Sequence, residues 1–223
     1  MSDPLLRLED VGFHYGPDRT VLSQCNFRLE PGQRIALVGS NGCGKTTLLH
    51  LMVGLLRPSA GRIEAFGRVR HSEADFYEVR CRAGLLFQES DDQLFCPTVA
   101  EDVAFGPLNL GKPRDEVRRI VAETLESVGL AGYEHRITYR LSSGEKRLVA
   151  LATVLAMQPE VLLLDEPSTG LDERTSQRLI ELLLRLPQAT VIVSHHREFW
   201  QAIAQSSLRL NDGRLEPWDE QHR

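Results

Sequence analysis

The sequence has little of what marks membrane-spanning, secreted or nucleic-acid-binding chains. Its purest apolar run, Val161–Leu164, is far shorter than the roughly 18 residues that a membrane-spanning helix needs. The segment Met1–Pro4 lacks a basic stretch followed by an apolar one, so we expect no secretory signal and a protein that stays in the cytoplasm. The formal net charge is −5, whereas non-specific nucleic-acid binding needs a basic surface. We therefore expect no nucleic-acid partner.

Cysteine is scarce as well. The chain has 4 cysteines, and no two of them stand in Cys-x-x-Cys spacing, which argues against a zinc knuckle. Because cytoplasmic thiols stay reduced, we expect free and partly buried cysteines rather than disulfides.

The apolar residues that are present alternate between strand and helix patterns. Short stretches separated by glycine, proline and aspartate turns predict antiparallel strands at 5–8, 11–15, 21–29 and 61–69. Continuous apolar runs predict strands buried on both faces at 35–38, 161–164 and 190–193. Helical spacing predicts helices at 45–55, 115–128 and 172–186, and a closing hairpin follows at 207–216. Together these patterns indicate an α/β fold with an antiparallel β part and a helical insertion at 91–157.

A glycine-rich segment between the predicted strand 35–38 and the helix after it matches the phosphate-loop pattern. Its residues are Gly39, Ser40, Asn41, Gly42, Cys43, Gly44, Lys45 and Thr46. The glycines let backbone N–H groups converge on phosphates, and the helix N-terminus adds partial positive charge. We expect Lys45 to contact the β- and γ-phosphates of ATP, Thr46 to ligate Mg²⁺, and Thr47 to hydrogen-bond the α-phosphate.

Two adjacent carboxylates, Asp165 and Glu166, follow the predicted buried strand 161–164, where the sites of α/β proteins form. Adjacent side chains at a strand end point in opposite directions, which allows two different roles. We expect Asp165 to hold Mg²⁺ through water and Glu166 to orient the attacking water. An exposed acidic turn is the alternative.

A third motif, Leu141–Glu145, precedes a predicted helix. Ser142 and Glu145 have the spacing of a capping box. A serine-capped helix start with Gly144 beside it is also an anion site, because glycine permits close approach of a phosphate. One chain with one phosphate loop does not need a second phosphate site for the same nucleotide, so we expect a second chain to use it.

The phosphate loop, the Leu141–Glu145 motif and the Asp165–Glu166 pair, in this order along the chain, resemble those of the ATP-binding cassette (ABC) ATPases, from about residue 5 to 216. The resemblance implies a phosphate-loop NTPase fold, one domain over 1–223, and an ATP hydrolase coupled to transmembrane transport. Its implied parts are an antiparallel β subdomain at about 1–32 and 57–82, a RecA-like core at about 33–56, 83–90 and 158–223, and a helical subdomain at about 91–157.

The resemblance also implies roles for three further residues. Tyr15 would stack on adenine, Gln88 would link Mg²⁺ to the partner subunit, and His195 would contact the γ-phosphate, so that Glu166, His195 and Gln88 form the catalytic set. Without the resemblance, Tyr15 reads as an ordinary strand aromatic and His195 as a core histidine. In this family two cassettes pair head to tail, with each ATP between one phosphate loop and the Ser142–Gly144 segment of the other chain. A homodimer is the simplest assembly, and a heterodimer with a related ATPase stays open.

Three residues depart from the family pattern. Ser143 stands where glycine is usual, Glu145 where glutamine is common, and His196 where aspartate is frequent. Serine adds only a hydroxymethyl group, so we expect activity to survive unless the backbone there needs a positive φ.

The stretch 87–107 resembles the ATPases of energy-coupling factor importers. This implies that an integral membrane subunit contacts the Gln88–Pro107 region, and that the protein is peripheral at the cytoplasmic face of the cell membrane. We expect Leu94 and Phe95 to be exposed for a helix-in-groove contact, although both could instead pack under the helical insertion. A transition-metal ion, cobalt or nickel, is our first expectation for the transported species. A vitamin, another small molecule, or a soluble non-transport role are the alternatives.

Overall fold

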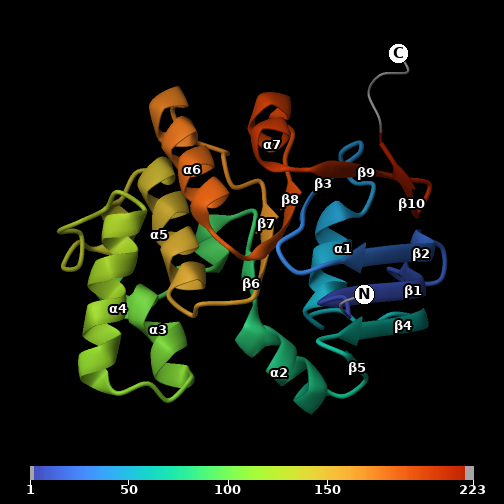
Figure 1. Ribbon diagram of the computed structural model, residues 1–223, viewed down its shortest axis with the longest axis horizontal. Coiled ribbons are helices and arrows are strands. Elements are labelled where there is room, and N and C mark those ends of the chain that lie inside the picture. Colours follow the sequence, from blue (N-terminus) through green and yellow to red (C-terminus); the bar gives the residue numbers. More distant parts are fainter. Residues whose placement is uncertain (1–2, 219–223) are drawn as a thin grey trace.

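The computed structural model describes residues 3–218, so the ends of the predicted domain, 1–2 and 219–223, lie outside the described residues. Two sheets organise the chain (Figure 1). The first is antiparallel, in the order β2 (Thr20–Leu29), β1 (Leu6–His14), β4 (Ala60–Ala65) and β5 (Arg68–Val69). The second has the order β10 (Arg214–Pro217), β9 (Ser206–Asn211), β3 (Arg34–Val38), β8 (Ala189–Val193), β7 (Val161–Asp165) and β6 (Ala83–Leu86), and only the β9–β10 pair in it is antiparallel.

Helices cover both faces of the second sheet. Their bounds are α1 (Lys45–Met52), α2 (Glu73–Arg82), α3 (Val99–Asn109), α4 (Arg114–Ser127), α5 (Ser143–Leu155), α6 (Glu173–Arg185) and α7 (Arg197–Ile203), with short 3₁₀ turns at Ser90–Asp92 and Thr138–Arg140. Helix α1 and the antiparallel sheet lie on one side of the second sheet, and α3 to α6 lie on the other (Figure 1). The α/β architecture with an antiparallel part and a helical insertion is confirmed.

The central strands contribute side chains to two separate hydrophobic cores, because successive side chains of a strand point to opposite faces. In β7, Val161 and Leu163 pack with α1 and the antiparallel sheet, whereas Leu162 and Leu164 pack with the helices of the other side. Every residue of β7 and β8 is buried. This confirms the prediction that the continuous apolar runs form strands buried on both faces.

The N-terminal strands differ from expectation. The stretches 5–8 and 11–15 form the single strand β1 rather than two strands, with register shifts against β2 between Leu8 and Val11. Asp10 has a positive φ of 49°, and the Asn26 side chain bonds both its N–H and its carboxylate at 3.0 Å. After such a bulge, the alternate set of residues faces inward. The apolar pattern of this one strand therefore resembles that of two separate strands.

Helix α2, at 73–82, is not among the helices predicted from the sequence. The helix buries only Phe76 and Val79, so its apolar periodicity is weak. Its start was nevertheless readable, because Ser72 and Asp75 form a capping box.

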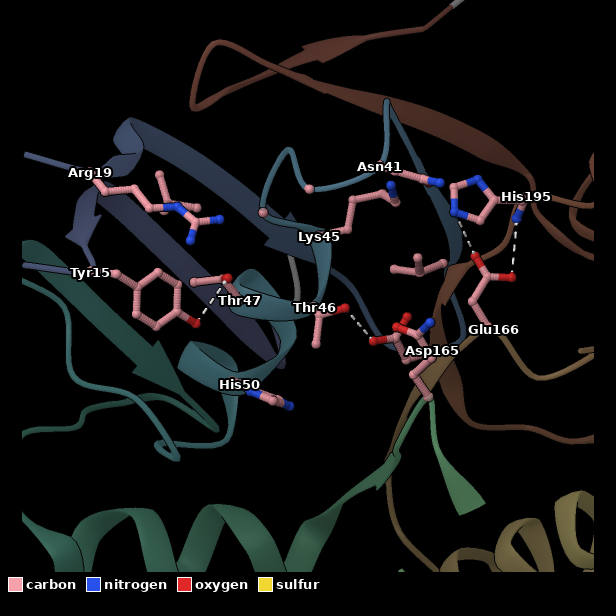
Figure 2. A pocket seen from close by; sticks show the side chains of 15 residues that line it. Tyr15, Arg19, Asn41, Lys45, Thr46, Thr47, His50, Asp165, Glu166 and His195 are labelled. Carbon is pink, nitrogen blue, oxygen red and sulfur yellow. Dashed lines mark hydrogen bonds and ion pairs between the residues drawn. The ribbon is translucent and has the colours of Figure 1, made fainter. Parts of the chain in front are cut away.

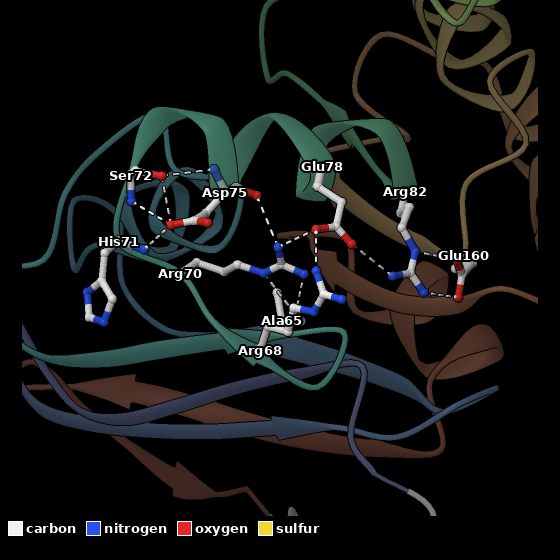
Figure 3. Close-up of polar contacts among 9 residues, drawn as sticks. All are labelled: Ala65, Arg68, Arg70, His71, Ser72, Asp75, Glu78, Arg82 and Glu160. Carbon is white, nitrogen blue, oxygen red and sulfur yellow. Dashed lines mark hydrogen bonds and ion pairs between the residues drawn. The ribbon is translucent and has the colours of Figure 1, made fainter.

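Buried Arg70 ties α2 to the antiparallel sheet (Figure 3). Its guanidinium donates to the Ala65 carbonyl at 3.0 and 2.9 Å and to the Glu78 carboxylate at 2.6 Å. At the C-terminal end of α2, Arg82 donates to both carboxylate oxygens of Glu160, at 2.6 and 3.0 Å. Because Glu160 directly precedes β7, α2 bridges the antiparallel sheet and the central strand.

Among residues 3–218, none of the helices has both the length and the apolar character needed to cross a lipid bilayer.

We predict that Arg70→Met lowers the free energy of unfolding by about 1–3 kcal/mol, because it removes both guanidinium donors of the Ala65 carbonyl. The matched control is Arg68→Met, whose exposed side chain lies 3.8 Å from Glu78 and contributes little as a surface pair. Urea denaturation measures both variants. Equal midpoints for the two would contradict the role of Arg70.

Candidate functional site

A cavity of about 550 Å³ opens at one edge of the six-stranded sheet. Four neighbouring parallel strands, β3, β8, β7 and β6, end at this edge. The segment after each strand end contributes to the cavity: the glycine-rich loop after β3, His195 after β8, Asp165 and Glu166 at the end of β7, and Gln88 after β6. The carboxyl ends of parallel strands are where α/β sites form.

The cavity brings together most of the residues expected from sequence (Figure 2). Those that line it are Tyr15, Asn41, Gly42, Gly44, Lys45, Thr46, Thr47, Gln88, Asp165, Glu166 and His195. Arg19, Val21, His50 and Val193 line it as well and were not expected. His50 follows Thr46 by one helical turn in α1, so helical periodicity could have found it.

Glycine is required in the loop because of the backbone conformation and because there is no room for a side chain. Gly39 and Gly44 have φ values of 150° and 110°, which side-chain-bearing residues rarely adopt. A Cβ at Gly39 would lie 2.7 Å from the Leu210 carbonyl, and one at Gly44 would lie 2.5 Å from the Val21 side chain. A Cβ at Gly39 would also lie 2.8 Å from Cys43 Sγ. Cys43, which does not line the cavity, thus points its thiol toward Gly39.

Lys45 begins α1, and its ammonium lies within the curl of the loop. Nζ donates to the carbonyls of Gly39 at 2.9 Å and Ser40 at 3.0 Å. The side chain is therefore already fixed where the loop N–H groups converge, and an anion in the cavity would meet a preplaced positive charge.

Asp165 is 2% exposed and accepts a hydrogen bond of 2.6 Å from the Thr46 hydroxyl (Figure 2). Burial raises the pKa of its carboxyl group, and the Thr46 hydrogen bond opposes that shift. Burial also lowers the pKa of His50, against the pull of the Asp165 charge. A carboxylate and a hydroxyl at this distance offer the oxygen ligands that Mg²⁺ prefers, and Mg²⁺ typically takes one or two protein ligands beside substrate phosphates.

Glu166 faces away from Asp165, as expected, but strand alternation is not the cause. Strand β7 ends at Asp165, and Glu166 adopts a positive φ of 51° with its N–H bonded to the Val193 carbonyl at 2.8 Å. Its Oε2 accepts the His195 N–H at 3.2 Å, and its Oε1 lies 3.3 Å from His195 Nε2. That second approach is not aligned as a hydrogen bond, so buried Oε1 has no hydrogen-bond partner among residues 3–218 and can accept one from the cavity.

Tyr15 forms the opposite wall from the carboxylates (Figure 2). Its hydroxyl lies 3.3 Å from Thr47 Oγ1, and its ring packs edge-on against Phe13 at 4.8 Å between centroids. The Arg19 guanidinium lies 5.7 Å from the ring centroid. A half-exposed aromatic ring with a cation beside it is suited to stacking on a planar ligand.

The Ser142–Gly144 segment does not line this cavity. The predicted capping box is confirmed: Ser142 Oγ accepts the Glu145 N–H, and the Glu145 carboxylate accepts the Ser142 N–H at 2.8 Å. Hydrogen bonds from Ser142 and Tyr133 hold the pKa of Glu145 below its usual value. Ser142 and Glu145 thus cap the start of α5, which lies outside the cavity described above.

The departures at Ser143 and His196 have local explanations. Ser143 is the first residue of α5 and has no positive φ, so its backbone does not require glycine. His196 Nδ1 lies 3.0 Å from Ser168 Oγ, which joins the two segments that follow β7 and β8.

The expectation for Leu94 and Phe95 is half wrong. Leu94 is 9% exposed and packs in the core beneath the helical insertion, because the 3₁₀ turn at Ser90–Asp92 turns it inward. Phe95 is 65% exposed and meets Phe105, 48% exposed, edge-on at 4.8 Å. The two aromatics line a second, largely apolar groove of about 220 Å³ together with Leu55, Leu85, Phe87, Val154 and Met157.

Comparisons with known proteins agree with this geometry. The family model described as ABC transporter matches residues 22–169. The energy-coupling factor transporter ATP-binding protein EcfA of Methanothermobacter thermautotrophicus is 45% identical over 215 residues, covering 95% of this chain and 69% of that protein. The cobalt import ATP-binding protein CbiO of Syntrophus aciditrophicus is 42% identical over 192 residues, covering 86% of this chain and 69% of that protein. The solved structure of cbiO1 from Clostridium perfringens, part of the ABC transporter complex cbiONQ, has a TM-score of 0.86 at 33% identity, over 96% of this chain and 88% of that one.

We predict that Ser143→Gly leaves the rate of ATP hydrolysis unchanged, because Ser143 already has a right-handed helical backbone. Glycine there should lower the free energy of unfolding by less than about 1 kcal/mol. Phosphate release and urea denaturation measure the two quantities.

The contrasting variant is Gly144→Ala, whose Cβ would lie 3.1 Å from the Gly170 carbonyl and crowd the helix start. It should lower the hydrolysis rate. A several-fold gain in rate for Ser143→Gly would show that the serine does impair the site.

Proposed function

The chain belongs to the ABC transporter family of ATPases, and from that premise we propose that it powers a cobalt or nickel importer of the energy-coupling factor type. ATP hydrolysis coupled to transport is the activity of this family, and the ABC ATPase fold expected from sequence is confirmed. The observation that carries the chemistry is the cavity where Lys45, the Thr46–Asp165 pair and Glu166 meet. We further propose that the chain forms a single ATPase domain with the three subdomains given above.

The loop and its lysine bind the triphosphate of ATP in this proposal. The N–H groups of the loop 39–44 and the Lys45 ammonium hold the β- and γ-phosphates, and Thr47 bonds the α-phosphate. Tyr15 stacks on adenine, which its half-exposed ring at the cavity wall supports. Lys45 exchanges its two carbonyl partners, Gly39 and Ser40, for phosphate oxygens.

Thr46, Asp165 and Gln88 hold Mg²⁺ beside the phosphates, Asp165 through water. When bound there, Mg²⁺ would supply the charge neutralisation that phosphoryl transfer to water requires. The short Thr46–Asp165 contact and the burial of the Asp165 carboxylate support this assignment. A carboxylate removed from water is stabilised by a nearby cation.

Glu166 orients the attacking water and accepts its proton, and His195 contacts the γ-phosphate. The unpartnered Oε1 of Glu166 gives water an acceptor inside the cavity. The His195 backbone N–H at 3.2 Å holds the other oxygen and so fixes the carboxylate. General-base assistance of this kind typically contributes about 10² to 10⁴ in rate.

The Ser142–Gly144 segment serves the ATP of a second chain. It lies outside the nucleotide cavity, and it offers N–H groups at the start of α5. Two copies paired about a twofold axis would give two equal shared sites. We propose a homodimer, and a heterodimer with a related ATPase is the alternative that the test below separates.

The aromatic groove of Phe95 and Phe105 receives a cytoplasmic helix of an integral membrane subunit. Aromatic residues that are exposed together on a monomer mark a contact surface. Buried Asp102 fixes this surface, since its carboxylate accepts the N–H groups of Phe95 and Cys96 at 3.0 and 2.9 Å. From this contact we infer a peripheral protein at the cytoplasmic face of the cell membrane, and we propose no nucleic-acid partner.

Cobalt or nickel is the cargo that the likeness to a cobalt import ATP-binding protein favours. A vitamin is the second candidate, since a relative is named for energy-coupling factor transport without a metal. Uptake of labelled cobalt, nickel and vitamins into a strain deleted for this chain decides between them. Complementation by the wild type but not by Lys45→Ala identifies the ATP-driven species, and vitamin uptake alone would overturn the metal assignment.

We predict that Glu166→Gln lowers ATP hydrolysis by about 10² to 10⁴ yet keeps nucleotide and Mg²⁺ binding. The variant should therefore run as a dimer in gel filtration with Mg-ATP and as a monomer without it. Lys45→Ala is the control that should lose ATP binding and the dimer together. Hydrolysis at the wild-type rate would remove Glu166 from catalysis, and a persistent monomer would mean that pairing needs a different subunit.

We also predict that Phe95→Ser/Phe105→Ser prevents co-purification with the membrane subunit while ATP binding stays at the wild-type level. Tyr77→Ser is the matched control, because Tyr77 is an exposed aromatic of α2 that lies outside the groove. Retained assembly of the double variant would show that the membrane subunit docks elsewhere.

A further inference from the structure

Arg147 is a buried cation, and moving a charged side chain out of water into the protein interior is energetically unfavourable. It lies one turn into α5, is 4% exposed, and its Nε has no hydrogen-bond partner among residues 3–218. Burial lowers the pKa of its guanidinium, and the charges of Glu89, Asp165 and Glu166 oppose that shift. A buried charge with an unpaired donor is weak as a stabilising device compared with an apolar side chain of the same size. Its presence therefore calls for a role other than stability.

The Arg147 guanidinium hydrogen-bonds the backbone on both sides of Gln88, a residue that lines the nucleotide cavity. Nη1 donates to the Phe87 carbonyl at 2.6 Å, and Nη2 donates to the Gln88 carbonyl. Gln93 makes a second link, since its Oε1 accepts the Phe87 N–H at 3.1 Å while its Nε2 donates to the Ala150 carbonyl of α5 at 3.0 Å. The backbone at Gln88 is thus held by groups that belong to or bind α5.

Gln88 also stands between two cavities. It lines the nucleotide cavity with Asp165 and Glu166, and it lines a separate cavity of about 250 Å³ with Ser143 and Arg147. A shift of the α5 start would therefore move the Gln88 peptide by way of one charged side chain.

We propose that Arg147 is a positioning residue that couples the two ATP sites of the paired assembly. The start of α5 meets the ATP bound mainly by the partner, and Gln88 belongs to the site of its own chain. Arg147 joins the two, so that occupancy of one site aligns Gln88 in the other. The inference rests on the shared site of the proposed function, and it adds the element that connects the two sites.

A double-mutant cycle on the purified full chain tests whether Arg147 acts through Gln88. Arg147→Met and Gln88→Ala should each lower the maximal rate of ATP hydrolysis, with about a 2- to 30-fold loss for Arg147→Met, the usual range for residues on a coupling route. The double variant should hydrolyse ATP no more slowly than Gln88→Ala alone, because both changes remove the same alignment. ATP affinity at low protein concentration, where chains are single, should stay unchanged.

The cooperativity of ATP hydrolysis is the second measurement, because it would not change if Arg147 had a purely structural role. The wild type should hydrolyse ATP with a Hill coefficient above one, and Arg147→Met should bring it close to one. Arg147→Lys, which keeps the charge but has a single donor nitrogen, should give an intermediate value and carries the test should Arg147→Met fold poorly. Lys146→Met is the matched control, since Lys146 pairs with the Asp91 side chain at 2.6 Å and should leave both quantities unchanged.

Two results overturn the proposal: additive losses in the cycle, or a wild type that hydrolyses ATP without cooperativity. Failure of the shared site itself is seen separately, as Glu166→Gln that stays monomeric with Mg-ATP. If Arg147→Met/Glu166→Gln still forms the ATP dimer while cooperativity is lost in Arg147→Met, the shared site stands and Arg147 is its connection.

Discussion

The whole site depends on the burial of parallel strands on both faces. Strands β3, β8, β7 and β6 run side by side in the same direction, so their carboxyl ends meet at one edge and their loops share one cavity. The two cores on either side of the sheet hold these strand ends in place. Because successive residues of β7 pack into one core or the other, a polar residue anywhere within the strand would disturb a core, and polar chemistry begins where the strand ends at Asp165.

Charge at this edge is arranged so that nucleotide can replace internal partners. Lys45 bonds to loop carbonyls, and Asp165 bonds to a hydroxyl rather than to a cationic side chain in the described part of the chain. Glu166 keeps one buried oxygen, Oε1, without a hydrogen-bond partner within residues 3–218, although His195 Nε2 lies 3.3 Å away. Buried groups with neutral or missing partners gain more from an incoming ligand than groups already in ion pairs, so the proposed Mg-ATP would supply the partners that folding leaves unmet.

Sequence patterns predicted the parts of the fold that depend on local rules. The buried strands, the glycine loop and the capping box at Ser142 could be predicted because each uses residue types with one physical purpose. The bulge at Asp10 was not, because it depends on a side chain of a neighbouring strand, Asn26. Leu94 was misplaced for a similar reason: an apolar pair in a loop does not reveal which member faces inward. Arg19 and the grip of Arg147 on Gln88 depend on tertiary proximity and have no local signal.

The aromatic groove and the nucleotide cavity share a backbone segment, which bears on how transport is driven. Phe87 lines the groove with Phe95 and Phe105, and the next residue, Gln88, lines the cavity. A helix seated in the groove would press on Phe87, whose N–H and carbonyl are both fixed by hydrogen bonds to Gln93 and Arg147. Since interior packing is dense and transmits displacement, a membrane subunit docked there as proposed would act on the same peptide that α5 holds. Docking and ATP pairing would then meet at Gln88, so a motion imposed from either side reaches the reacting phosphate.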